Sequence, residues 1–187
     1  VKINHLVPAE FPPAVLEQVE SLVPEPSEED MAGRRDLRDL PFVTIDGDTA
    51  KDFDDAVEVE RLGEGQFLLR VAIADVSHYV RTGSPMDREA QDRGNSWYFP
   101  TSVEPMLPKE LSNGLCSLNP GVNRLVMWAE VPFDAGGRPG KAAFGTGVIR
   151  SFGRLTYDGV RDVVLLHDAA AEDRFRETVR EPARVLA

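Results

Sequence analysis

The chain has 187 residues, 42% of them hydrophobic and 28% charged, and its formal net charge is −11 at pH 7. This composition is ordinary for a globular protein, and the negative charge argues against binding nucleic acid through a basic surface of its own. Its apolar runs are shorter than the ~18 residues that a membrane helix needs. The single Cys116 excludes an internal disulfide, so we expect a cytoplasmic protein.

The first segments predict a helix and then a connector. Residues 12–23 begin with proline and place apolar side chains on one face of an amphipathic helix. Residues 24–40 are rich in proline and charge and predict a solvated connector. The chain opens on VKINHLVPAE without an initiator Met and stops in an uncapped helical pattern. We therefore expect it to be a piece of a longer protein.

Strands follow in the next part of the chain. The short apolar run 42–45 predicts a buried strand that ends at Asp46. Residues 56–60 alternate between apolar and polar side chains, residues 61–66 form a turn signal, and residues 67–76 predict the return strand of a hairpin.

The remaining elements predict an α+β fold, with a mixed, largely antiparallel sheet and flanking helices. They are a short helix ended by Gly94 (85–94), a strand running into a turn (124–140), one or two strands (141–157) and two helices (157–167 and 171–187).

Aspartates crowd the stretch after the first predicted strand, at positions 46, 48, 52, 54 and 55. Two carboxylates ~4 Å apart repel by roughly 4 kcal/mol at an effective dielectric of 20, unless protons or a cation relieve them. Oxygen ligands of this kind suit Mg²⁺ or Mn²⁺, and a pair of such ions can promote phosphodiester hydrolysis. The plain alternative is an acidic loop whose aspartates serve only turn chemistry.

Two other motifs are alternatives to a metal site in this stretch. An EF-hand loop is excluded, because counting from Asp46 places Lys51 where glycine is needed and Val57 where glutamate is needed. The stretch VTIDGDTA also resembles the first motif of the haloacid dehalogenase phosphatases, in which Asp46 would be the nucleophile. Ala50 departs from that pattern, and this alternative stays open at this point.

Three longer blocks carry a more specific resemblance. DLRDLPFVTIDGDTAKDFDDAVEV, LLRVAIADVSHYV and RGNSWYFPTSVEPMLPKELSNGLCSLNP occur in this order. Together they closely resemble the catalytic RNB domain of the ribonuclease II and ribonuclease R exoribonucleases. The ribonuclease R branch is nearer, also through FPPAVLEQVE and VIRSFGRLTYDGV. The resemblance covers roughly residues 8 to 165.

The resemblance implies an activity and a site. The family degrades single-stranded RNA processively from its 3′ end to nucleoside 5′-monophosphates, with Mg²⁺ as cofactor and Mn²⁺ as the other candidate. Its four active-site aspartates match Asp46, Asp52, Asp54 and Asp55. By the same resemblance, Asp46, Asp52 and Asp55 hold metal, whereas Asp54 is the residue most needed for the chemical step.

Other candidate substrate-binding residues surround the second and third blocks. Tyr98 matches a family tyrosine that stacks on a base near the RNA 3′ end, although the WYF run would otherwise be interpreted as strand core. Arg93 is a candidate phosphate ligand, as is Lys109, although each is by type more often a surface charge.

Three further residues in these blocks have side chains of types that occur in catalytic sites. His78 is interpreted as structural rather than as a general base, and Asp75 as a residue that could orient it or extend the acidic site. Cys116 is interpreted as a buried apolar residue.

The chain also departs from the family in length. We expect residues 1–35 to form an N-terminal helix and acidic connector, and residues 36–187 to form the N-terminal half of an RNB catalytic domain, an incomplete domain. The resemblance implies as partners single-stranded RNA, the missing C-terminal half and flanking cold-shock and S1-type RNA-binding domains. The remaining alternative is a non-catalytic RNB-like module that binds RNA or protein.

Overall fold

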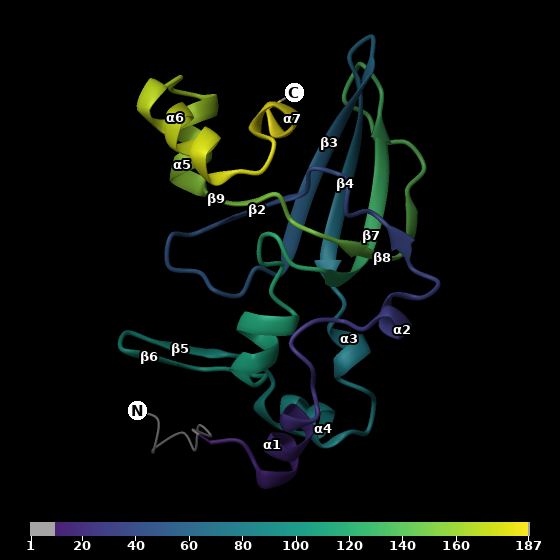
Figure 1. The fold of residues 1–187 in the computed structure, drawn as a ribbon, viewed down its shortest axis with the longest axis vertical. Helices are drawn as coiled ribbons and strands as arrows, with labels where there is room; N and C mark the ends of the chain where they lie inside the picture. The colour runs from purple at the N-terminus through teal and green to yellow at the C-terminus, as the bar shows by residue number, and fades with distance from the viewer. Residues whose placement is uncertain (1–9, 187) are drawn as a thin grey trace.

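The computed structural model describes residues 10–186 and is built around a seven-stranded sheet (Figure 1). Its strands, in spatial order, are β1 (Arg35–Asp36), β8 (Ala143–Ile149), β7 (Arg124–Phe133), β4 (Gln66–Ala74), β3 (Asp55–Gly63), β2 (Val43–Asp46) and β9 (Gly153–Thr156). The pairs β1–β8 and β2–β9 are parallel, and the other neighbours are antiparallel. The predicted α+β fold with a mixed, largely antiparallel sheet is therefore confirmed.

Helices and a small hairpin gather around the sheet. The helices are α1 (Pro13–Glu20), α2 (Glu28–Met31), α3 (Val76–Tyr79), α4 (Pro85–Arg93), the π-helix η2 (Glu110–Leu115), α5 (Tyr157–Val164), α6 (Ala169–Thr178) and α7 (Pro182–Val185). Figure 1 shows α5, α6 and α7 beside β9, α1 next to α4 at the opposite end, and the hairpin of β5 (Trp97–Phe99) and β6 (Ser102–Glu104) projecting sideways. Over residues 10–186, every helix is too short or too polar to cross a membrane.

The β3–β4 hairpin follows the prediction from its alternating pattern. Glu64 and Gly65 form its two-residue turn, and both have positive φ angles, 51° and 80°. Such a turn matches the twist of the two strands, and glycine takes this conformation without steric cost. The strands continue to the Gly63–Gln66 pair, so the turn is shorter than predicted.

Several elements were not predicted from the sequence. The predicted connector contains the short helix α2 and strand β1, whose Arg35 pairs with Gly147 of β8. Helix α3 and strand β6 also lie in stretches where no element was predicted, whereas β5 matches the alternative interpretation of the WYF run as a strand. The pairing of β2 with β9 joins segments over 100 residues apart, and a local pattern cannot contain that information.

The core lies between the sheet and the helices at its lower end in Figure 1. Val15 of α1 is 1% exposed and belongs to the same buried cluster as Phe42, Phe53 and Leu118. The predicted amphipathic helix thus packs on the core that also supports the aspartate loop. A second, smaller cluster joins Phe175 of α6 to α5.

Candidate active site

Asp46 is the last residue of β2 and pairs with Thr156 of β9. Burial and then the charge of Asp55 raise the pKa of the Asp46 carboxyl, and the nearby Arg154 partly opposes the shift. The nearby Thr44 hydroxyl also opposes this rise in pKa. Its Oγ1 is nevertheless without a hydrogen bond of good geometry among residues 10–186. Within those same residues, the buried Asp46 Oδ2 has no hydrogen-bond partner. Such an oxygen is costly to bury and is suited to accept a cation.

Asp52 and Asp54 lie in the loop between β2 and β3, and Asp55 is the first residue of β3. The Asp54 carbonyl accepts a hydrogen bond from the Ala74 amide at 2.9 Å, which ties the loop to the end of β4. The Asp54 side chain is exposed, yet the surrounding protein partly desolvates it. This desolvation and then the charges of Asp52, Asp55 and Asp46 raise the pKa of Asp54. The four carboxylates are therefore electrostatically coupled.

The coupled carboxylates do not form a finished metal centre. Among residues 10–186, no group of three or more carboxylate, imidazole or thiolate side chains is arranged to hold a metal ion. The predicted ligand set of Asp46, Asp52 and Asp55 thus stays a prediction. The chemistry of the donors fits a hard divalent cation, because every candidate ligand is a carboxylate oxygen and a cation would relieve their repulsion.

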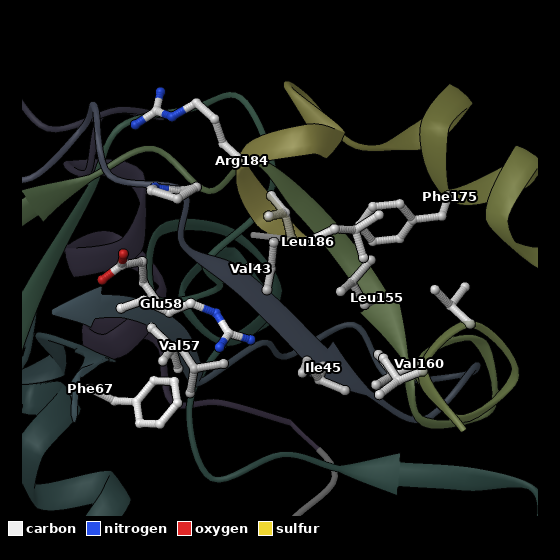
Figure 2. Close-up of a pocket in the computed structure, with 16 residues that line it drawn as sticks. Val43, Ile45, Val57, Glu58, Phe67, Leu155, Val160, Phe175, Arg184 and Leu186 are labelled. Carbon is white, nitrogen blue, oxygen red and sulfur yellow. The ribbon is translucent and has the colours of Figure 1, made fainter. Parts of the chain in front are cut away.

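An apolar cavity of about 280 Å³ lies on the other face of this part of the sheet, between β2, β3, β9 and the C-terminal helices. Figure 2 shows Val43 and Ile45 of β2 and Leu155 of β9 around it. Because side chains alternate along a strand, Thr44 and Asp46 point to the opposite face. None of the four aspartates lines this cavity, so it is separate from the acidic site.

Tyr98 lies beside the acidic loop, on strand β5. Its side chain is 70% exposed, and its hydroxyl donates to Asp52 Oδ2 at 3.4 Å. Partial burial and then the charge of Asp52 raise the pKa of the Tyr98 phenol. Trp97 is also exposed, so the interpretation of these rings as strand core does not hold for Tyr98 and Trp97. The position of Tyr98 is compatible with base stacking at the site, which stays a prediction.

Arg93 is placed differently from the expectation. Its side chain is buried, pairs with Glu89 at 2.8 Å and donates to the carbonyls of Pro105 and Glu10 at 3.1 and 2.7 Å. The guanidinium also stacks on Phe11, 3.8 Å from the ring centre. These contacts make Arg93 a packing residue that fastens α4, so the prediction that it binds substrate is wrong. Lys109, the other predicted phosphate ligand, is exposed.

His78 and Asp75 belong to a separate polar network. His78 Nε2 lies 2.9 Å from Asp30 Oδ1, and Asp75 accepts from Arg34 and Ser77, each at 2.7 Å. Burial raises the pKa of Asp75, but the hydrogen bonds from Ser77 and Arg34 outweigh it and leave that pKa lowered. This network ties α3 to α2, which agrees with a structural role for His78.

Cys116 is buried, as the sequence indicated. Burial raises the pKa of its thiol to about 12, so the thiol stays protonated near neutral pH. A protonated, buried thiol is a poor nucleophile, which agrees with the interpretation of Cys116 as a packing residue.

Two residues at the site were missed by the sequence reasoning. Arg154 donates from Nη2 to the carbonyls of Gly47 and Asp48, and Ser117 contacts the backbone on both sides of Asp52. Both lie more than 60 residues from the aspartates they support. The quoted blocks contain them, but no local spacing indicates which backbone groups they reach.

Comparison with known proteins identifies the family. The model of the RNB domain matches residues 34–185 of this chain. The chain belongs to the RNB domain family. The predicted resemblance is thereby confirmed, and the haloacid dehalogenase interpretation of VTIDGDTA is set aside, because the RNB match covers that stretch.

Relatives named ribonuclease R agree with this assignment. Ribonuclease R of Escherichia coli strain K12 is 55% identical over 157 residues, which cover 84% of this chain and 19% of that protein. The chain thus spans about a fifth of the length of the curated relatives that match first. The structure of Mycoplasma genitalium RNase R in complex with ribose methylated single-stranded RNA matches with a TM-score of 0.82 and 39% identity, over 89% of this chain and 26% of that chain.

A more distant neighbour shares the fold alone. The yeast protein Ssd1, described as a pseudonuclease, matches with a TM-score of 0.68 and 21% identity, over 84% of this chain and 20% of that chain. The RNB fold is therefore also found in a protein that is called a pseudonuclease.

Proposed function

We propose that this chain supplies the acidic part of the active site of a Mg²⁺-dependent exoribonuclease. The enzyme would degrade single-stranded RNA processively from the 3′ end to nucleoside 5′-monophosphates. The observation that carries the proposal is the coupling of Asp46, Asp52, Asp54 and Asp55 beside the exposed ring of Tyr98. Membership of the RNB family and the relatives named ribonuclease R support it.

Three of the aspartates are the proposed cation ligands. Asp46, Asp52 and Asp55 would hold Mg²⁺, with Mn²⁺ as the other candidate, since both ions prefer carboxylate oxygens. When bound, such a cation lowers the pKa of water and neutralises charge that develops on the phosphodiester oxygens.

Asp54 is the residue proposed to act in the chemical step. Its exposed carboxylate can accept a hydrogen bond from the attacking water and take up its proton. Its pKa is raised by desolvation and by three negative neighbours, which makes it a stronger base than an ordinary aspartate. A position at the loop surface leaves this carboxylate accessible to water and RNA.

Tyr98 is proposed to hold the base at the 3′ end. An aromatic face stacks on any base and contributes about 1–3 kcal/mol without sequence preference. With a net charge of −11, this chain contributes little of the phosphate attraction that RNA binding needs. We assign that attraction to the rest of the RNB domain and to cold-shock and S1-type domains of the whole protein.

The test uses the whole protein and a single-stranded RNA labelled at its 5′ end. With Mg²⁺ we expect a ladder that shortens from the 3′ end and that a chelator abolishes. Asp54→Asn should slow hydrolysis by roughly 10²–10⁴-fold, because a positioned base is lost, and should leave RNA affinity within about twofold. Loss of RNA binding with unchanged hydrolysis per bound complex would contradict this role.

A second candidate function is a module that binds RNA without cleaving it. The lack of a preassembled ligand group among residues 10–186 favours it, as does the shared fold with a protein called a pseudonuclease. In the same assay, this alternative predicts that the wild-type protein shifts the RNA on a native gel and leaves it full length on a denaturing gel.

A further inference from the structure

The loop between Asp46 and Asp55, residues 47–54, is fastened by groups that are distant in sequence. Inside it, the Ala50 amide donates to the Gly47 carbonyl at 3.1 Å. Phe53 is buried in the core, whereas Asp54 on its other side is exposed. Because the coupled carboxylates repel one another, the conformation of this loop depends on contacts that hold its backbone against that repulsion.

Ser117 provides one such contact from the segment that follows η2. Its side chain is fully buried, and its Oγ accepts from the Phe53 amide at 3.1 Å and donates to the Lys51 carbonyl at 3.0 Å. The next residue, Leu118, donates its amide to the Phe53 carbonyl at 2.8 Å. One hydroxyl therefore bridges the backbone on both sides of Asp52.

Arg154 provides the second contact from β9. Its Nη2 donates to the carbonyls of Gly47 and Asp48, at 2.9 and 2.7 Å. The same guanidinium lies over the ring of Phe53, 5.3 Å from its centre. The parallel register of β2 and β9 places Arg154 two residues before Thr156, the partner of Asp46. Arg154 thus connects the two ends of the loop and brings a positive charge to it.

We propose that Ser117 and Arg154 are positioning residues that fix the backbone of residues 47–54 so that Asp52 can share a cation with Asp46 and Asp55. Neither the serine hydroxyl nor the guanidinium is a carboxylate ligand of the kind that Mg²⁺ prefers. Ser117 therefore acts through Asp52, and Arg154 acts through the backbone next to Asp46. The inference rests on the proposed function, since it concerns the same acidic site. It predicts that the loop is held in place before any cation binds.

Hydrogen exchange of the whole protein in chelator tests the positioning without metal or activity. In Ser117→Ala we expect the Phe53 amide to lose its acceptor and exchange faster, together with the rest of residues 47–54. In Arg154→Met we expect faster exchange over the same loop, with partial recovery in Arg154→Lys, which retains a donor. Exchange in β4 and β7 should stay unchanged in all three variants.

Titration with Mn²⁺ gives the second readout. Outer residues that orient ligands typically change metal affinity by 10–100-fold, so we expect each variant to bind Mn²⁺ about 10-fold more weakly. In the nuclease assay, kcat should fall while KM for RNA stays within about twofold, because the loop and not the RNA contacts is altered.

Matched controls separate positioning from general packing. Ser151 is also buried and donates to the carbonyls of Gly153 and Phe42, neither of which belongs to residues 47–54. Arg180 stacks on Phe152 at 4.5 Å, as Arg154 stacks on Phe53. Ser151→Ala and Arg180→Met should leave loop exchange and Mn²⁺ affinity at wild-type values.

These measurements distinguish failure of the positioning role from failure of the proposed function. Loop exchange and Mn²⁺ affinity at wild-type values in both Ser117→Ala and Arg154→Met would overturn the positioning role alone. A wild-type protein that binds no Mn²⁺ would overturn both the positioning role and the proposed function. If Ser117→Ala raises exchange throughout the sheet, the serine is needed for folding, and the half-buried Arg154 then decides the question.

Discussion

The hydroxyl oxygen of Tyr98 lies 3.4 Å from Oδ2 of Asp52. This distance is at the outer limit of a hydrogen bond and indicates a weak contact. It nevertheless places an aromatic ring that is 70% exposed at the edge of the acidic loop. A ring held there by its tip keeps its faces available for a base, next to the carboxylates proposed to act on the adjoining phosphodiester.

Replacement of Tyr98 should therefore weaken RNA binding only when the aromatic ring is lost. We expect Tyr98→Ala to cost about 1–3 kcal/mol of binding free energy, because base stacking is lost. Tyr98→Phe keeps the ring and should bind RNA nearly as well as the wild type. Fluorescence anisotropy with a labelled single-stranded RNA measures both, and Phe144→Ala, an exposed aromatic on β8, is the control. Equal affinities for Tyr98→Ala and the control would exclude stacking at Tyr98.

Mg²⁺ should stabilise the whole protein through Asp46. At a cation concentration of 100 times Kd, binding to the folded state adds about 2.7 kcal/mol to the free energy of unfolding. Asp46→Asn removes the charge beside the unpartnered buried oxygen and should lose more than half of this gain. Calorimetric melting with and without Mg²⁺ measures it. Asp48→Asn, in the same loop, should retain the full Mg²⁺ effect, and a similar loss in both variants would refute the assignment to Asp46.

The pH dependence of stability should reveal the cost of ionising Asp54 in the folded protein. Its pKa is raised in the folded protein, so the folded state binds more protons above the ordinary pKa and stability falls as pH rises through this range. In chelator, the melting temperature of Asp54→Asn should thus be roughly 2 °C above that of the wild type at pH 7.5. At pH 3 the two melting temperatures should be the same.

Asp87 supplies a control of opposite sign for this measurement. Hydrogen bonds from the Gly83 amide and then from Gln91 lower the pKa of Asp87. Its stabilising effect is present above the ordinary aspartate pKa and disappears as pH falls. Asp87→Asn should therefore lower the melting temperature at pH 7.5, and a decrease of the same sign in Asp54→Asn would contradict the raised pKa.

Arg93 should affect stability and not RNA recognition. Arg93→Met leaves Glu89 and two carbonyls without their buried partner, and loss of one member of a buried pair costs about 3–5 kcal/mol. Arg88→Met on the same helix removes an exposed contact to Gly83 and should cost about 1 kcal/mol or less. Denaturant unfolding measures both. If folded Arg93→Met binds RNA much more weakly than the wild type, Arg93 has a substrate role after all.

Local patterns in the sequence were sufficient for many of the elements. The alternation over 56–60 and the turn signal after it predicted the β3–β4 hairpin, and Gly94 marked the end of the predicted short helix that is α4. These signals are local, because neighbouring residues decide the backbone conformation of a turn or a helix end. The first and last residues of the strands were less well predicted, because hydrogen-bond pairing with neighbouring strands extends them beyond the residues that alternate.

For the candidate site, the sequence by itself determined the residue types. The run of aspartates, their placement after a strand and the family blocks are all present in the printed letters. Only the tertiary structure decided which groups meet. It buried Arg93 in packing contacts, left Tyr98 exposed, and brought Ser117 and Arg154 to the loop. The physical reason is that parallel pairing of β2 with β9, and packing of the segment after η2, are non-local contacts that a short window of sequence does not encode.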